Sequence, residues 1–199
     1  MGADTAIADV GSTMIKLLRD KMSDLVPQGS SIALISPVDA EAKDVRLALF
    51  LYGVMENAYM KNQEMSAIGP NQLQQPPLVL ELYYLLTAYA PQQIPDASDM
   101  TLYEHRLLGR AMSIFYDNAV LSGSMLQAGL AGQDDVQRIT MHPISLDDLT
   151  KLWTTFPNLQ YKPSVSYMVT PVTIDSKLVT TTGRVVSREL DYQQIEEAP

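Results

Sequence analysis

The sequence predicts one α+β domain, an antiparallel sheet of about four or five strands with helices packed on it. Residues 45–52 alternate between an apolar and a mixed face, as a half-buried strand does. Residues 78–90 are apolar on both faces and lie between prolines, which is typical of a strand covered on both sides. Apolar residues recur at three- and four-residue steps over 7–25 and over 101–121, which predicts two amphipathic helices.

The first predicted element is the helix over residues 7–25. Asp4 or Thr5 can cap its start, and Pro27 followed by Gly29 ends it. The stripe that it buries is Ile7, Val10, Met14, Leu17, Leu18, Met22 and Leu25.

Strands are expected next, over residues 31–38, 45–52 and 78–90. In the second of them, one face holds Val45, Leu47, Leu49 and Leu51, and the other holds Arg46, Ala48, Phe50 and Tyr52. Residues 45–55 and 78–88 are expected to pair antiparallel across a long connection.

The connection from Asn57 to Pro77 is rich in glutamine and proline and has no clear periodicity. A loop of this length inside a compact domain is usually functional or mobile. Two interpretations stay open: a surface loop without a partner, or a segment that becomes ordered against a neighbouring subunit.

The helix over 101–121 is predicted to begin at a capping box formed by Thr101 and Glu104. A second capping box, Ser145 with Asp148, predicts a short helix that Pro157 stops.

Two further strands are predicted in this half of the chain. One covers residues 136–141. The other covers 164–174, where Val165, Tyr167 and Val169 alternate with Ser166, Met168 and Thr170.

The charge balance argues against a nucleic-acid partner. The chain has 23 acidic and 14 basic residues, a formal net charge of −9, and no cluster of lysine and arginine. Phosphate binding depends on such clusters.

Sites of cofactor, metal or catalytic chemistry are not expected. The chain has no cysteine, its only histidines are His105 and His142, and its ten glycines form no phosphate-binding loop. His105 fits a surface or packing role, and His142 fits a solvent-facing or hydrogen-bonded structural role. The pairs Asp134–Asp135 and Asp147–Asp148 fit a turn and a helix start. We therefore predict no catalytic, cofactor-binding or metal-binding residues, and no enzyme.

No direct membrane span is expected, because the longest apolar stretches are far shorter than the roughly 20 residues that a spanning helix needs. The opening residues Met1 to Asp4 lack a basic leader, so no signal peptide is expected. The chain is thus expected to be cytoplasmic on synthesis.

Several side chains are candidates for contacts with other proteins. Exposed methionine beside an aromatic ring makes an adaptable contact surface, although burial within the chain is the alternative. Two arginines one turn apart form a solvated face or take carboxylates from a neighbour. These candidates are Tyr59, Met60, Met65, Ile68, Arg106 and Arg110.

Six segments, in order and spacing, resemble one known family. They are Ile7–Leu18, Leu47–Tyr52 with Glu56–Asn57, Pro76–Thr87, His105–Met112 with Asp117–Asn118, Leu149–Trp153, and Tyr167 with Ile174–Ser176. Together they resemble the cap, or tail-terminator, family of extracellular contractile injection systems of the antifeeding-prophage and virulence-cassette type, a domain formerly of unknown function.

The resemblance covers about residues 5–176 and implies a phage tail-terminator-like domain over residues 1–176. Residues 177–199, which include Val185 and Val186, change in character and are expected to form a C-terminal arm, or a hairpin that turns at Thr182–Gly183. It implies a structural cap subunit, without an active site, that ends tube and sheath polymerisation at the end distal from the baseplate. The implied partners are copies of itself in a hexameric ring, sheath subunits and inner tube subunits, in a particle that is released or cell-associated.

Two alternatives remain open from the sequence. The chain could be an adaptor or tube-completion subunit elsewhere in such a particle. It could also be a small-ligand-binding domain whose site leaves no sequence signature.

Overall fold

The computed structural model describes residues 4–126 and 136–183. Its helices are α1 (Ala6–Lys21), α2 (Pro37–Ala42), α3 (Ala97–Asp117) and α4 (Leu146–Thr154), with short 3-10 turns at Gly29–Ser31 and Gly123–Met125. Its strands are β1 (Ile32–Leu34), β2 (Leu47–Glu56), β3 (Ser66–Gly69), β4 (Gln72–Gln74), β5 (Leu78–Ala88), β6 (Val120–Leu121), β7 (Gln137–Met141), β8 (Ser164–Ile174) and β9 (Val179–Thr181).

The chain divides into two compact units. The first comprises Met1–Asn62 and Pro77–Asp175, and the second comprises Gln63–Pro76 and Ser176–Pro199. The division at residue 176 that the resemblance implies stays a prediction.

The first unit contains a six-stranded sheet in the order β1-β2-β5-β8-β7-β6. All neighbours pair antiparallel except β1, which runs parallel to β2. The predicted antiparallel sheet with packed helices is therefore confirmed, with one parallel edge strand and more strands than expected. The predicted pairing of residues 45–55 with 78–88 is confirmed as β2 with β5.

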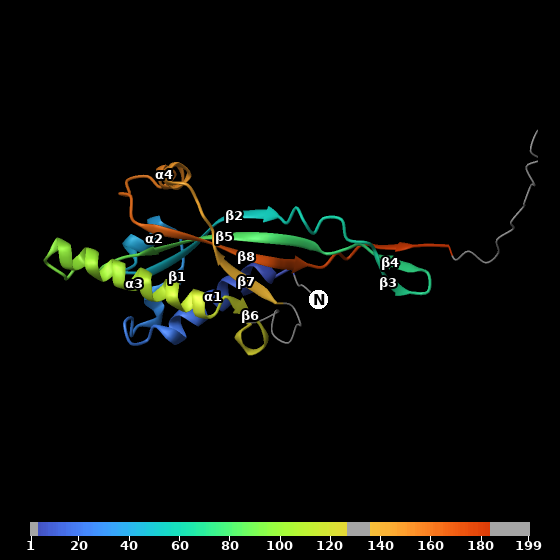
Figure 1. The fold of residues 1–199 in the computed structure, drawn as a ribbon, viewed down its shortest axis with the longest axis horizontal. Helices are drawn as coiled ribbons and strands as arrows, with labels where there is room; N and C mark the ends of the chain where they lie inside the picture. The colour runs from blue at the N-terminus through green and yellow to red at the C-terminus, as the bar shows by residue number, and fades with distance from the viewer. Residues whose placement is uncertain (1–3, 127–135, 184–199) are drawn as a thin grey trace, which may run out of the picture. The chain divides into compact units, whose positions relative to one another are not determined.

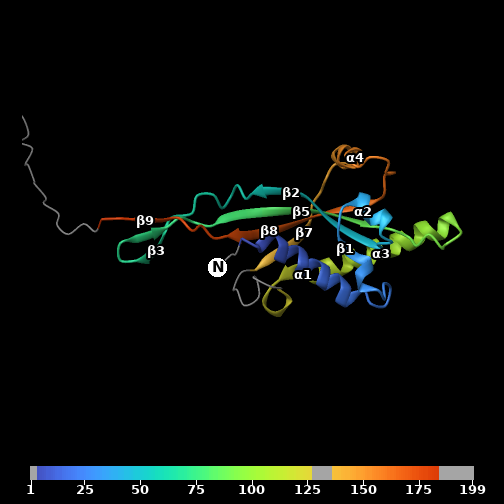
Figure 2. The same cartoon turned by 180° about the vertical axis from the view of Figure 1, so that it is seen from behind.

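Helices cover both faces of this sheet. Figure 1 shows α4 on one side of the strands and α1 and α3 on the other, and Figure 2 shows the same layers from behind. The main core lies on the side of α1 and α3, where α1 residues such as Met14 and Leu18 meet sheet residues such as Leu49 and Leu86. On the opposite side Leu85 of β5 packs under α4 with Trp153. Residues 78–90 were expected to form a strand covered on both faces. This is confirmed, because β5 is buried on both faces along most of its length.

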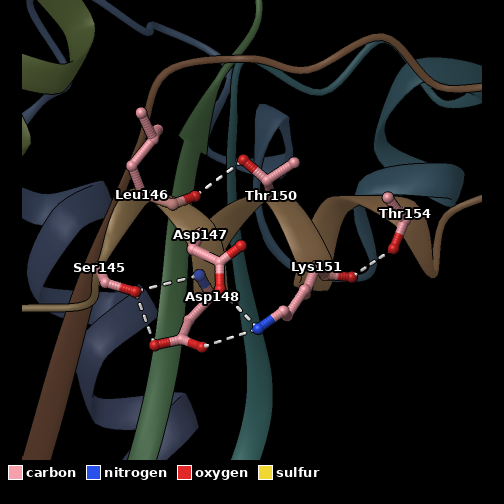
Figure 3. A network of polar contacts seen from close by, with 7 residues as sticks. All are labelled: Ser145, Leu146, Asp147, Asp148, Thr150, Lys151 and Thr154. Carbon is pink, nitrogen blue, oxygen red and sulfur yellow. Dashed lines mark hydrogen bonds and ion pairs between the residues drawn. The ribbon is translucent and has the colours of Figure 1, made fainter.

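The start of α4 agrees with the sequence. The Ser145 hydroxyl oxygen accepts a hydrogen bond from the Asp148 N–H at 3.1 Å, and the hydroxyl donates to Asp148 Oδ2 at 2.7 Å (Figure 3). Lys151 forms an ion pair with Asp147 one turn away. This cap holds in place the helix that carries Leu149 and Trp153 onto the sheet.

The capping box predicted at Thr101 and Glu104 is wrong. The helix begins one turn earlier, where Asp96 accepts a hydrogen bond from the Asp99 N–H at 3.0 Å. Thr101 lies inside the helix and donates to the Ala97 carbonyl. Asp96 is as good a cap as threonine, and it keeps the first turn, which the capping box would have excluded, within the helix.

The strand predicted over 31–38 is only three residues long. After β1 the chain turns into α2, whose first residue is Pro37 and whose N-cap is Ser36. Proline at the first helical position after a serine is a normal helix start, so Pro37 begins a helix within the stretch that was expected to be a strand.

The connection from Asn57 to Pro77 is not structureless. It contains the antiparallel hairpin of β3 and β4, and β4 also pairs with β9 to give a three-stranded sheet in the order β3-β4-β9. A partner from within the same chain therefore orders this segment, whereas both expectations for it invoked either no partner or another subunit.

Candidate functional site

Tyr59 lies on a turn that is anchored to the sheet. Its side chain is 96% exposed. Its N–H donates to Asn57 Oδ1 at 3.0 Å, and the buried Asn57 side chain in turn donates to Thr170 Oγ1 at 3.3 Å. Met60 follows, half-buried, with its N–H on the Asn57 carbonyl. The first unit thus presents an exposed aromatic ring on a backbone that the sheet holds in place.

Met65 and Ile68 belong to the second unit. They lie just before and within β3 and are 49% and 50% exposed. The structure therefore places them on a different unit from Tyr59 and Met60. Val185 and Val186 lie outside the described residues.

Arg106 and Arg110 lie on α3 and are both exposed. Arg110 is engaged within its own chain, because its Nη2 donates to the Lys21 carbonyl at 3.3 Å and lies 3.9 Å from Asp24 Oδ2. These contacts tie α3 to the end of α1, so Arg106 is the better placed of the two to meet a carboxylate from another protein.

Sequence reasoning missed an aromatic cluster on the face of the sheet that carries α4. The Tyr83 ring lies 4.9 Å from His142, edge to face, and 6.1 Å from Tyr52. The Tyr83 hydroxyl donates to Glu81 Oε2 at 2.6 Å, and this hydrogen bond, with burial, raises the pKa of Tyr83 to about 12. Tyr83 is therefore protonated at neutral pH, and its hydroxyl hydrogen is used in the hydrogen bond to Glu81.

Alternation along β5 carries the signal for this cluster, since residues 81, 83 and 85 share one face. His142 is half-buried and packs its ring against Tyr83, a contact that its expected solvent-facing or hydrogen-bonded role did not include. His105 is exposed on α3. In residues 4–126 and 136–183, no group of three or more His, Asp or Glu side chains is arranged to hold a metal ion.

A second polar cluster joins α3 to the segment before β8. Glu104 Oε1 accepts hydrogen bonds from Lys162 Nζ at 2.7 Å and from the Ala90 N–H at 3.0 Å. The Lys162 ammonium also lies 5.4 Å from the centre of the Tyr89 ring. No local sequence pattern indicates this pair, because its members are 58 residues apart.

An apolar groove of about 660 Å³ lies between the C-terminal half of α3 and β7. Its lining includes Tyr116 and Met141, which are 86% and 62% exposed, above the buried Phe115 and Tyr167. The ring of Phe115 meets that of Tyr167 at 4.9 Å and closes the floor of the groove. Its walls offer contact area and few polar groups.

Over the described parts of the chain, no helix is both long and apolar enough to cross a bilayer.

The fold is that of a tail terminator. It is similar to a cryo-EM structure of the PVC sheath/tube terminator of an extracellular contractile injection system in the extended state, with a TM-score of 0.64 at 18% identity. It is also similar to a cryo-EM structure of the anti-feeding prophage cap, a tube terminating cap, with a TM-score of 0.61 at 19% identity.

These matches cover 100% and 93% of this chain, and the chain spans 67% and 61% of the lengths of the two proteins. The Pvc16 N-terminal domain profile matches residues 9–188. The chain therefore belongs to the Pvc16 N-terminal domain family. No curated protein matches it in sequence.

Proposed function

We propose that this chain is a structural terminator subunit of a contractile injection particle, one that ends the growth of tube and sheath at the end distal from the baseplate. The observation that carries the proposal is family membership over residues 9–188 together with a fold shared with two terminating caps. In this role the chain acts through shape and association and catalyses no reaction.

A terminator must close a ring. Identical subunits form a closed ring when one surface of each copy meets a different surface of the next. We propose a ring of six copies, the number that the resemblance to the cap family implies. Further contacts would be made to sheath and inner tube subunits, and none to nucleic acid. The chain would be made in the cytoplasm and built into the particle there.

The exposed candidate residues supply contact surfaces for this role. Tyr59 on the turn after β2, and Met65 and Ile68 at β3, are large side chains that a lone subunit would leave in water, and the half-buried Met60 lies next to Tyr59. Arg106 offers a charged contact, while Val185 and Val186 belong to the proposed arm.

The test is the length of the particles that form without the chain. Deleting its gene is expected to give tails of abnormal or uncontrolled length, and wild-type complementation is expected to restore the normal length distribution in electron micrographs. Tails of normal length that lack a baseplate would support an adaptor role instead. Finished particles of normal length and composition would contradict the proposal.

Self-association is measured separately on the purified chain. Rings in negative stain and early elution from a sizing column are expected. A protein that stays monomeric at high concentration and binds a small ligand in a polar pocket would support the ligand-binding alternative.

A further inference from the structure

The three-stranded sheet of the second unit has two open edges. Its order is β3-β4-β9, and within the described residues no strand pairs with the outer side of β3 or of β9. Open edges present unpaired N–H and C=O groups to other chains, and proteins normally cover or block them. Neither lysine nor proline blocks β3 or β9, since their residues are Ser66–Gly69 and Val179–Thr181.

The printed register shows which backbone groups point outward. Leu178 and Thr182 bond to Gln75 and Asn71 on the β4 side, so Thr180 between them also faces β4. In an antiparallel ladder the alternate residues point away, which leaves the N–H and C=O groups of Val179 and Thr181 on the open edge of β9.

The same alternation applies across β4 to β3. Gln74 lies opposite Val179 and so turns its backbone groups away from β9, toward Ser66 on β3. Ala67, the next residue of β3, then points its N–H and C=O to the open edge. Because β3 and β9 are both antiparallel to β4, they run in the same direction.

These two edges fit each other. In a parallel ladder one residue bonds to the two neighbours of the residue opposite it. With Ala67 of one copy opposite Thr180 of the next, the Ala67 N–H would meet the Val179 carbonyl and the Thr181 N–H would meet the Ala67 carbonyl. The two outward groups of Ala67 therefore meet one C=O and one N–H of the β9 edge in the direction and spacing that a parallel ladder requires.

Charge and polarity favour a second copy as the occupant. The whole chain carries a net charge of −9, so most of its surface repels a copy of itself. In the described part of the second unit the only charged residues are Glu64 and Lys177, which offset each other. One face of this sheet is also apolar and uncovered, because Met65 and Leu178 lie on the same side as Leu73 and are 49% and 60% exposed.

We infer that the β3 edge of one copy pairs in parallel with the β9 edge of the next copy, so that the small sheets join into one continuous sheet around the ring. This inference rests on the proposed function, since it names a neighbour within the proposed ring. The described residues of the second unit contain three short strands and no helix, and such a small sheet is only marginally stable alone. In the proposed pairing, neighbouring copies supply the contacts that stabilise it.

Disulfide trapping tests the pairing on the full chain, which has no cysteine of its own. In the double variant Ala67→Cys/Thr180→Cys, the two positions of one copy are separated by β4, about 10 Å apart at a strand spacing of about 4.8 Å. That is too far for a disulfide, which needs Cα atoms within about 7 Å. Oxidation is therefore expected to give a ladder of covalent oligomers on a non-reducing gel.

The single variants Ala67→Cys and Thr180→Cys are the controls, and each is expected to stay at the protomer position. Dimers from a single variant would show that like edges meet, which overturns the heterologous pairing. No ladder from the double variant in preparations that form rings would overturn the inference and leave the proposed function standing. If the wild-type chain forms no rings at all, the proposed function fails and this inference with it.

A second pair of variants removes only the hydrogen bond. Thr181→Pro deletes an outward N–H and leaves the ladder to β4 intact, since proline is tolerated on an edge strand. Thr181→Val keeps that N–H. We expect Thr181→Pro to shift the chain from ring to protomer on a sizing column and Thr181→Val to keep the ring. Equal ring fractions for the two variants would contradict the pairing.

Discussion

Removing the Glu104 carboxylate is predicted to destabilise the first unit by about 2–3 kcal/mol. The side chains of Glu104 and Lys162 are 15% and 27% exposed, and the carboxylate also accepts the Ala90 N–H. Hydrogen bonds to charged groups each contribute about 1.5–3 kcal/mol. Two such bonds would sum to about 3–6 kcal/mol. The estimate is lower than that sum, because Lys162 can turn its ammonium toward water once its partner is gone.

The assay is denaturant and thermal unfolding of a matched series. Glu104→Ala is expected to lower Tm by about 5–10 °C, at about 2–4 °C per kcal/mol for a chain of this size. Glu104→Gln keeps an acceptor for the Ala90 N–H and should cost about 1 kcal/mol. Adding Lys162→Met completes a double-mutant cycle, for which we expect a coupling of about 1–2 kcal/mol.

Two results would refute this reasoning. Glu104→Ala within about 0.5 kcal/mol of the wild type would mean that the carboxylate is fully solvated. A coupling near zero in the cycle would mean that Glu104 and Lys162 do not interact in solution.

Three further predictions concern the caps, the core and pH. Asp96→Ala should cost about 1 kcal/mol and Thr101→Ala much less, because Asp96 is the N-cap of α3; equal costs in urea unfolding would contradict this start. Phe115→Ala should cost about 3–5 kcal/mol by the same measurement, since Phe115 is 1% exposed; a loss below 1 kcal/mol would count against the packing. The raised pKa of Tyr83 contributes stability that is present below the unfolded pKa of about 10 and is lost as pH rises toward about 12. Glu81→Gln should lower that pKa toward 10 in an NMR tyrosine titration assigned with Tyr83→Phe, and an unchanged value would show that Glu81 is not the cause.

The sequence predicts the elements whose signals are local and repeated. The alternation along residues 45–52 and 164–174 and the two-sided apolar run at 78–90 correspond to β2, β8 and β5. Ser145 is a cap because the serine, the following acidic residues and the apolar spacing all agree at one place.

The predictions made from the sequence are wrong where two local signals compete. Thr101 and Glu104 have the spacing of a capping box, but Asp96 lies one turn earlier and Glu104 bonds to Ala90 and Lys162, which are distant in sequence. Pro37 can end a strand or begin a helix, and Ser36 before it decides for the helix α2.

The remaining features could not be predicted from the sequence, because they depend on contacts between residues that are far apart in the chain. Strands β3 and β4 are short and rich in glutamine, so neither has a recognisable pattern, and β9 reaches β4 only across about one hundred residues of chain. Tyr59, Met65 and Ile68 are exposed, and their role as contact residues stays a prediction. The cluster around Tyr83 could not be predicted, because only the packed sheet brings His142 next to Tyr83.

The position of the chain within the particle tests the central claim most directly. Particles carrying a tagged copy of the chain would be labelled and imaged by electron microscopy. The account predicts label at one end only, opposite the baseplate, in the amount of a single ring for each particle. Label at the baseplate end, along the shaft, or absent from finished particles would contradict it.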